Sequence, residues 1–275
     1  MRTTPLLVLG IAMAATAAFA WQGVGAPESP TAEELPVAEP TVPVAPAAEA
    51  PVAWMRPAGP VRVALQAGHW KAREAPDEQA GLRDNGTRGG GKAEWEVNLE
   101  IARQTARILE DSGYVVEVLP TTIPPGYWAD LFISIHADGS TSPGASGYRA
   151  ASPRRDATGR AAEFAQILDD AYGAETGLPY YGSVTRRMRG YYAFNHRRYQ
   201  HALHPMTVGV ILETGFLSSA RDRGVIIGTP ERSARGIARA VTRYLDPVPR
   251  AVPTVTRTLI VEQRDPGQRN GDEAR

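Results

Sequence analysis

Two histidines and two glutamates are the residues of this chain with the clearest chemical potential. They are His69, Glu94, His136 and Glu213, in the segments Ala67-Gly68-His69, Glu94-Trp95-Glu96-Val97-Asn98-Leu99, Ser134-Ile135-His136-Ala137-Asp138 and Ile211-Leu212-Glu213-Thr214-Gly215-Phe216-Leu217-Ser218. Three nitrogen or oxygen donors of these types can hold a zinc ion and leave one position open for water. A further carboxylate is what the hydrolysis of an amide then needs. The four residues together predict metal-assisted hydrolysis.

The predicted elements bring these residues to one place. Strands are predicted over 61–65, 114–119, 131–135 and 208–212, and helices over 94–110, 161–171 and 230–244. His69, His136 and Glu213 each follow one of the strands, and Glu94 opens the first helix. In open α/β sheets ligands bind at the carboxyl ends of the strands, so we expect the four side chains to share one crevice.

The alternation of strands and helices also predicts the fold class. We expect an α/β fold, a three-layer domain whose mostly parallel or mixed central sheet is flanked by helices. The run 131–135 is almost wholly apolar and predicts a strand that is buried on both faces. A threonine and a proline at Thr229 and Pro230 are typical of a helix start.

Composition divides the chain into four parts. Residues 1–20 have a cationic start, a short apolar run and small residues before Ala20, which predicts a signal peptide for export. The apolar run of about 15 residues is shorter than the roughly 20 that span a membrane, so a retained anchor is the less favoured alternative. Residues 21–60 form a Pro/Ala-rich linker. Residues 61–246 form the predicted catalytic domain, and 247–275 a flexible C-terminal tail.

Cysteine content and charge limit the classes of function. The chain has no cysteine, so an exported form has no disulfide, and any metal must be held by His, Asp or Glu. The net charge of +0 argues against nucleic acid as a partner, because such binding rests largely on neutralising phosphates. Contact with a membrane is expected only transiently, through the export segment, and the chain is expected to act as a monomer.

Each candidate residue also has an ordinary structural explanation. A histidine that follows a strand is more often hydrogen-bonded within the protein or solvent-facing than a metal ligand. Glu94 places a favourable charge in the first turn of a helix, and Glu213 is compatible with a solvated strand end. His136 differs, because an unpartnered imidazole at a buried strand end costs roughly a few kcal/mol. Elsewhere, His196, His201 and His204 favour a polar loop over a second metal cluster, since two arginines follow His196.

Taken together, the segments from about 61 to 245 resemble the zinc-dependent N-acetylmuramoyl-L-alanine amidases, which cut bacterial peptidoglycan. The segments that contain His136 and Glu213 are the most specific parts of the resemblance, and the helix start at Glu94 matches in the expected order. The resemblance implies that His69, Glu94 and His136 bind Zn²⁺, that Glu213 is the catalytic carboxylate, and that peptidoglycan is the substrate. Other divalent metals are compatible with this donor set.

Two segments depart from the family pattern. The usual Asp-Pro-Gly-His-Gly-Gly is replaced here by Gln66-Ala67-Gly68-His69-Trp70-Lys71, and the arginine common after the second strand has no counterpart in 120–124. The loop 70–91 is therefore expected to shape a divergent pocket. The segment 191–195 offers aromatic rings and an amide, either to line a sugar-peptide groove or for ordinary packing. A non-catalytic wall-binding protein and a zinc peptidase or deacetylase acting on another cell-wall amide are the alternative functions.

Overall fold

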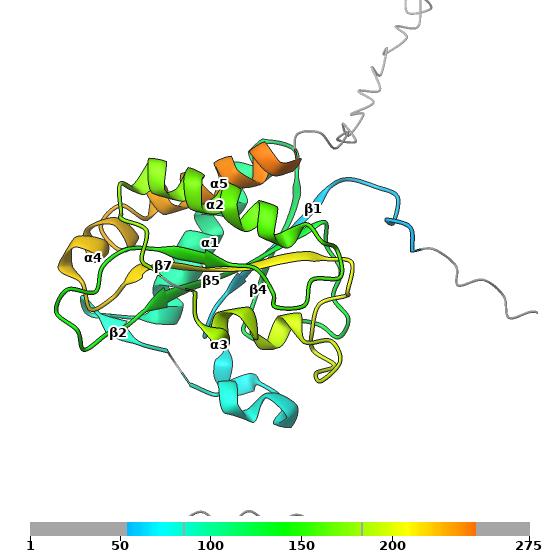
Figure 1. Ribbon diagram of the computed structural model, residues 1–275, viewed down its shortest axis with the longest axis horizontal. Helices are drawn as coiled ribbons and strands as arrows, with labels where there is room; N and C mark the ends of the chain where they lie inside the picture. The colour runs from blue at the N-terminus through cyan, green and yellow to red at the C-terminus, as the bar shows by residue number, and fades with distance from the viewer. Residues whose placement is uncertain (1–53, 85, 183, 246–275) are drawn as a thin grey trace, which may run out of the picture. The chain divides into compact units, whose positions relative to one another are not determined.

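The central part of the chain folds into alternating strands and helices (Figure 1). The computed structural model describes residues 54–84, 86–182 and 184–245, so the predicted signal peptide, most of the linker and the tail lie outside the described residues. In chain order the elements are β1 (Arg62–Ala67), η1 (Ala72–Glu74), η2 (Asp77–Leu82), β2 (Arg88–Gly89), β3 (Lys92–Ala93), α1 (Glu94–Asp111), β4 (Val115–Leu119), β5 (Leu131–Asp138), β6 (Arg149–Ala151), α2 (Ala161–Thr176), α3 (Arg186–Arg189), η3 (Tyr192–Phe194), β7 (Val208–Phe216), α4 (Ala220–Ile226) and α5 (Pro230–Leu245).

The main sheet has five strands in the order β4-β1-β5-β7-β6. Strands β4, β1, β5 and β7 run parallel, and the short edge strand β6 pairs antiparallel with β7. The mixed sheet flanked by helices confirms the predicted fold class. Strand β6 was not predicted, because three residues are too few to show the alternation that identifies a strand in a sequence.

Alternate residues along the strands face two different layers. Val63 and Leu65 belong to the larger apolar core, under the long helices, whereas Ala64 packs on the opposite face of the sheet. Helices α1, α2 and α5 lie over the first face, and α3 lies on the other side of the sheet (Figure 1). The second face is covered by short segments, among them η3. The sheet thus has one face under long helices and one face under short, irregular segments.

Strands β5 and β7 extend beyond their predicted ends. His136 and Glu213, which were expected at the ends of these strands, lie within them, near their carboxyl ends. The two residues are register partners across the parallel β5–β7 pair. Their side chains therefore lie on the same face of the sheet, in neighbouring positions.

Two glycines before α1 form the turn of a short hairpin. Strands β2 and β3 pair antiparallel, and the two residues between them, Gly90 and Gly91, have φ values of 60° and 82°. Positive φ at both central positions is the requirement of the tightest hairpin turn, which favours glycine. No helix in the described part of the chain is long and apolar enough to cross a membrane.

Candidate metal centre

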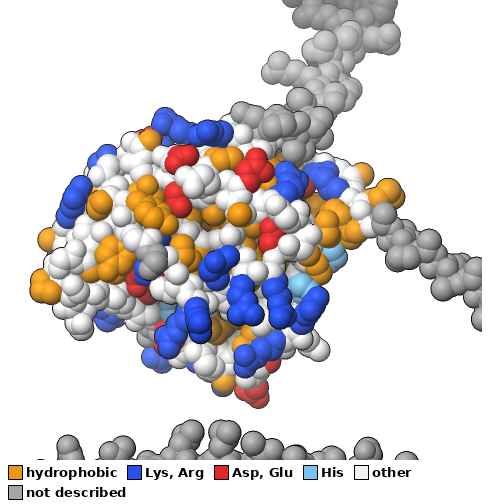
Figure 2. Space-filling model, viewed as in Figure 1, with side chains coloured by type: hydrophobic (Ala, Val, Ile, Leu, Met, Phe, Trp, Pro, Cys, Tyr) orange, Lys and Arg blue, Asp and Glu red, His pale blue; other side chains and the backbone are white. Residues whose placement is uncertain are grey.

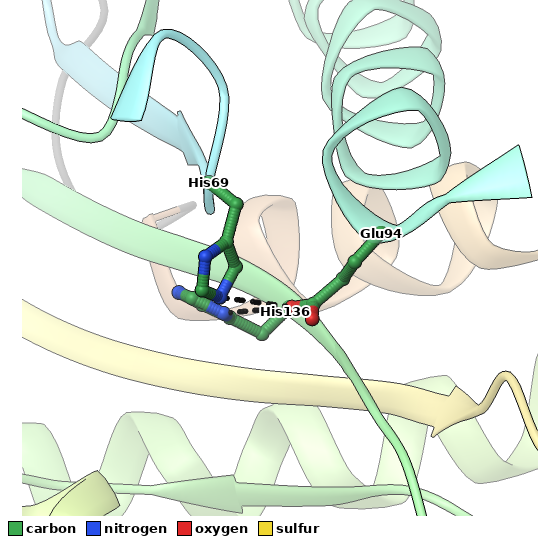
Figure 3. Close-up of side chains that lie close together, drawn as sticks. All are labelled: His69, Glu94 and His136. Atoms are coloured by element: carbon green, nitrogen blue, oxygen red, sulfur yellow. Dashed lines mark hydrogen bonds and ion pairs between the residues drawn. The ribbon is translucent and has the colours of Figure 1, made fainter. Parts of the chain in front are cut away.

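Three of the four candidate residues converge from separate elements. His69 follows β1, Glu94 is the first residue of α1, and His136 lies in β5, and their side chains point toward one another (Figure 3). Their ligand atoms all lie within 4.8 Å of one another. Glu94 is 4% and His136 8% exposed. The structure thus brings three of the four predicted residues together.

The distances within this group fit a small cation. His136 Nδ1 lies 3.0 Å and His69 Nε2 lies 3.5 Å from the same oxygen, Oε1 of Glu94. Tetrahedral zinc with bonds of roughly 2.1 Å separates its ligand atoms by about 3.4 Å. Two imidazoles and one carboxylate are also a ligand set found in catalytic zinc sites. The three residues can therefore hold such an ion with little movement.

Glu94 is held as a carboxylate by several donors. Its Oε2 accepts from the backbone N–H of Thr87 at 2.9 Å, and its Oε1 accepts from the N–H of Ala137 at 3.2 Å. Burial raises the pKa of this carboxyl group. The opposite effect is larger and comes from the hydrogen bond with His136, the charges of His136 and His69, and the N–H of Thr87. The net pKa is therefore below the ordinary value. A buried anion between two imidazoles is well suited to a cation.

His69 is oriented by a second carboxylate. Its Nδ1 lies 2.8 Å from Oδ1 of Asp84, which leaves Nε2 facing Glu94. Metal-binding histidines commonly use their second nitrogen in this way, because the outer partner fixes the ring and its tautomer. His69 also has a φ of 61°, a left-handed conformation that is rare outside glycine and often occurs at functional sites. Asp84 was not predicted, because it lies in a loop without a recognisable pattern.

A chain of hydrogen bonds holds the other ring nitrogen of His136, on the side away from Glu94. Its Nε2 lies 3.2 Å from the hydroxyl of Tyr191, which donates to Oε1 of Gln66 at 2.9 Å. Ser134 donates to the same Gln66 oxygen at 2.6 Å. Gln66 therefore positions the Tyr191 hydroxyl that contacts His136.

The electrostatic surroundings of His136 favour a positive charge at this position. Burial lowers the pKa of the imidazole, but the hydrogen bond to Glu94 and the negative charges of Glu94, Glu213 and Asp138 more than offset burial and leave the pKa raised. A site that stabilises a protonated imidazole also stabilises a metal cation, since both respond to the same carboxylates.

Two glycines leave room for the ligands. A Cβ atom at Gly68 would lie less than 3.0 Å from the ring of His136, and one at Gly86 would meet both Glu94 and His69 at less than 3.0 Å. The backbone therefore approaches the three ligands more closely than any residue with a side chain allows.

Glu213 borders this group without belonging to it. The residue is the register partner of His136 on one side and of Arg149 on the other. Burial raises the pKa of Glu213 to about 8; the charge of His136 lowers it, the carboxylates Asp138 and Glu94 raise it, and Arg149 lowers it. The side chain keeps partial contact with solvent. Such a carboxyl group can exchange protons near neutral pH.

Sequence reasoning missed the charged pair that flanks Glu213. Arg149 of β6 forms an ion pair with Asp138 at the end of β5. Arg149 is also the register partner of Glu213, so the pair lies beside this carboxyl group. Asp138 lies in the segment around His136 but was given no role, and Arg149 belongs to no motif. The remaining histidines match the polar-loop prediction, since Nδ1 of His201 lies 2.6 Å from Oε1 of Glu78. Among the described residues, His69, Glu94 and His136 are the one group found with metal-binding spacing.

Comparisons with known proteins identify a family and a shared fold. The family model described as N-acetylmuramoyl-L-alanine amidase matches residues 63–243. No curated protein sequence matches the chain. Among solved structures, an N-acetylmuramoyl-L-alanine amidase from Clostridium difficile 630 has a TM-score of 0.52 at 20% identity, covering 70% of this chain and 100% of that chain. The amidase AmiC2 of Nostoc punctiforme has a TM-score of 0.50 at 20% identity, covering 69% of this chain and 99% of that one. These two structures share the fold.

The fold and site define an α/β enzyme domain with a His-Glu-His group of metal-binding spacing near the carboxyl ends of its strands. The chain belongs to the N-acetylmuramoyl-L-alanine amidase family, whose model matches most of its length. The family resemblance seen in the sequence is thereby confirmed.

Proposed function

We propose that this protein hydrolyses the amide bond between N-acetylmuramic acid and L-alanine in peptidoglycan, using zinc held by His69, Glu94 and His136. Membership of the amidase family supports the reaction class. The observation that carries the metal assignment is the convergence of the three ligand atoms within 4.8 Å, on two imidazoles and one buried carboxylate. When bound, zinc activates a water molecule for attack and polarises the carbonyl of the amide.

In this proposal Glu213 is the proton shuttle. Its carboxylate takes a proton from the attacking water and passes it to the nitrogen of the departing L-alanine, so that the C–N bond breaks with a neutral amine as the leaving group. The raised pKa, about 8, falls when the neighbouring pocket holds a cation, because positive charge favours the carboxylate form. The group then begins the reaction as a base and completes it as an acid.

The other residues of the centre keep the reacting groups in position. Asp84 holds His69 through Nδ1, and Tyr191 holds His136 through Nε2. The ion pair between Arg149 and Asp138 neutralises charge beside Glu213. We also propose that the protein acts in the cell envelope or outside the cell, with residues 1–20 serving export, because peptidoglycan lies there.

The experiment compares the wild-type protein with Glu213→Gln for metal content and for products released from purified peptidoglycan. We expect equal zinc content in both, and a rate of release that is roughly 10²- to 10⁴-fold lower in the variant, because the proton shuttle is lost. Glu100→Gln is the matched control, since Glu100 accepts a hydrogen bond from Gln104 along α1. Chelation of the metal should silence wild type, and added zinc should restore it.

Mass spectrometry of the products separates this proposal from its alternatives. The amidase releases intact stem peptides that begin with the free amine of L-alanine. Shorter peptides or free acetate would instead indicate a peptidase or a deacetylase, and no release by wild type would indicate a wall-binding protein. Full activity in Glu213→Gln would remove the proposed role of this residue.

A further inference from the structure

We propose that an arginine-rich groove beside the metal centre binds the carboxylate groups of the peptidoglycan stem peptide. The inference rests on the proposed function and names the part of the substrate that this face of the protein recognises. The arginine groove has a volume of about 590 Å³, and its lining includes Arg154, Arg155, Arg186, Arg189, Tyr191 and Phe194. This volume lies within the range of roughly 300–1,000 Å³ typical of ligand sites.

The local sequence of α3 explains why arginines line the groove. The helix has the sequence Arg-Arg-Met-Arg, and Met188 is buried against Ala151 and Ile211 of the sheet. The hydroxyl of Thr185 accepts a hydrogen bond from the N–H of Met188 and caps the helix. With the methionine anchored, the three arginines of the helix are left exposed to solvent.

The guanidinium groups of the groove are available for a ligand. Arg154, Arg155, Arg186 and Arg189 are all exposed, and no carboxylate in the described parts of the chain lies within ion-pair distance of them. Other arginines do have such partners: Arg235 on α5 lies 2.7 Å from a carboxylate oxygen of Glu175. Figure 2 shows Lys and Arg side chains gathered over the part of the surface where α3 lies in Figure 1.

Tyr191 connects the groove to the metal centre. Its ring lines the groove, and its hydroxyl lies 3.2 Å from Nε2 of His136. The groove also lies on the face of the sheet toward which His136 and Glu213 point. Ile211 stands two residues before Glu213 on β7, so both side chains share a face, and Ile211 packs against Met188 of α3. The groove and the centre are therefore adjacent, with Tyr191 between them.

The charge of the groove selects the peptide part of the substrate. The lactyl carboxyl group of muramic acid is consumed in the scissile amide, so the glycan side offers little negative charge, whereas the stem peptide carries free carboxylates beyond L-alanine. Guanidinium groups bind carboxylates through paired, charge-assisted hydrogen bonds. A long anionic polymer needs an extended basic surface, whereas this groove is concave and next to the centre.

The test is a binding titration of the full-length protein with a free stem tetrapeptide, and with the same peptide after its carboxylates have been converted to carboxamides. We expect wild type to prefer the carboxylate form. Arg186→Gln combined with Arg189→Gln should weaken binding of that form roughly tenfold, since exposed ion pairs contribute a few-fold each, and should leave the carboxamide form unchanged. Arg103→Gln with Arg107→Gln is the control, because both residues are exposed on α1 and change the net charge equally.

Kinetics supply a second readout. On soluble muropeptides the groove variant should raise KM by a similar factor and leave kcat within about twofold of wild type, because it removes binding that is equal in the ground and transition states. Equal losses in the groove and control variants, or equal affinity of wild type for both peptides, would overturn the proposal. So would loss of affinity for poly(glycerol phosphate) without loss for the peptide, which indicates a surface for anionic polymers.

These outcomes also separate the groove from the proposed function. Peptide binding that depends on Arg186 and Arg189, in a protein that releases nothing from peptidoglycan, would support the groove and contradict the amidase reaction. Normal release of stem peptides without such dependence would contradict the groove alone.

Discussion

Gly68 lies against the ring of His136 with no space for a side chain. Gly68→Ala should therefore displace the imidazole and weaken zinc binding by roughly 10- to 100-fold, the range found when the support of a metal ligand is disturbed. Competition with a chromophoric chelator measures this affinity. Gly81→Ala is the control, because a Cβ atom there meets nothing within 4 Å. Unchanged affinity in Gly68→Ala would show that the ligand geometry tolerates such a shift.

At the residue scale the sequence singled out the three residues of the candidate metal centre but not the residues that contact them. His69, Glu94 and His136 stand next to predicted strands and a helix start, within segments that resemble a known family. Tyr191 and Asp84 contact the ligands through folding of distant loops, 55 and 15 residues apart in sequence from their partners. No periodic pattern encodes such contacts, so only the three-dimensional structure reveals them.

At the scale of elements, Asp222 joins α4 to the sheet. Its fully buried carboxylate accepts hydrogen bonds from the N–H of Gly147 at 2.7 Å and of Phe216 at 2.8 Å, and from the hydroxyl of Ser146 at 2.5 Å. Asp222→Ala leaves these buried donors without an acceptor and should lower the free energy of unfolding by roughly 3 kcal/mol. Urea denaturation measures the loss.

The control for this prediction is Glu110→Ala, at an exposed position near the end of α1. Its effect should stay within about 0.5 kcal/mol, as is usual for surface substitutions. A similarly small effect of Asp222→Ala would mean that water replaces the carboxylate. The loop before β6 and the end of β7 would then be held together by other contacts.

Long elements were predictable from the sequence, and short ones were not. The helix predicted over 94–110 is observed as Glu94–Asp111, because its apolar residues recur three and four positions apart over several turns. The four-residue α3 and three-residue β6 offer no such repetition. Both nevertheless enter the proposals made above, since β6 carries Arg149 and α3 carries arginines of the groove.

At the scale of the whole molecule, the pH dependence of stability has an identifiable contributor. Burial raises the pKa of Asp169 from 3.8 to about 7; the hydrogen bond from Ala150 lowers it, and the charge of Asp170 raises it. The folded state thus binds a proton that the unfolded state has released. This residue lowers stability progressively as the pH rises from about 4 to about 7.

Asp169→Asn should remove this penalty. The asparagine side chain keeps an oxygen that can accept the hydrogen bond from the N–H of Ala150, which is 2.8 Å long in the wild type. It has no charge, so its burial carries no cost of removing a charge from water. We expect its Tm to exceed that of wild type at pH 8, with a much smaller difference at pH 4. Thermal unfolding at the two pH values measures this, and any effect of metal cancels between the proteins. An equal difference at both pH values would contradict the role of titration.

The pairing of β5 with β7 has a consequence for how such a protein can change over evolutionary time. His136 and Glu213 are neighbours on adjoining strands, so their spacing follows from the backbone ladder and not from any loop. Changes in the loops that cover this face of the sheet therefore leave the spacing of these two residues intact. The sheet thus fixes the relative position of these two residues, while the surrounding loops are free to change in length and sequence.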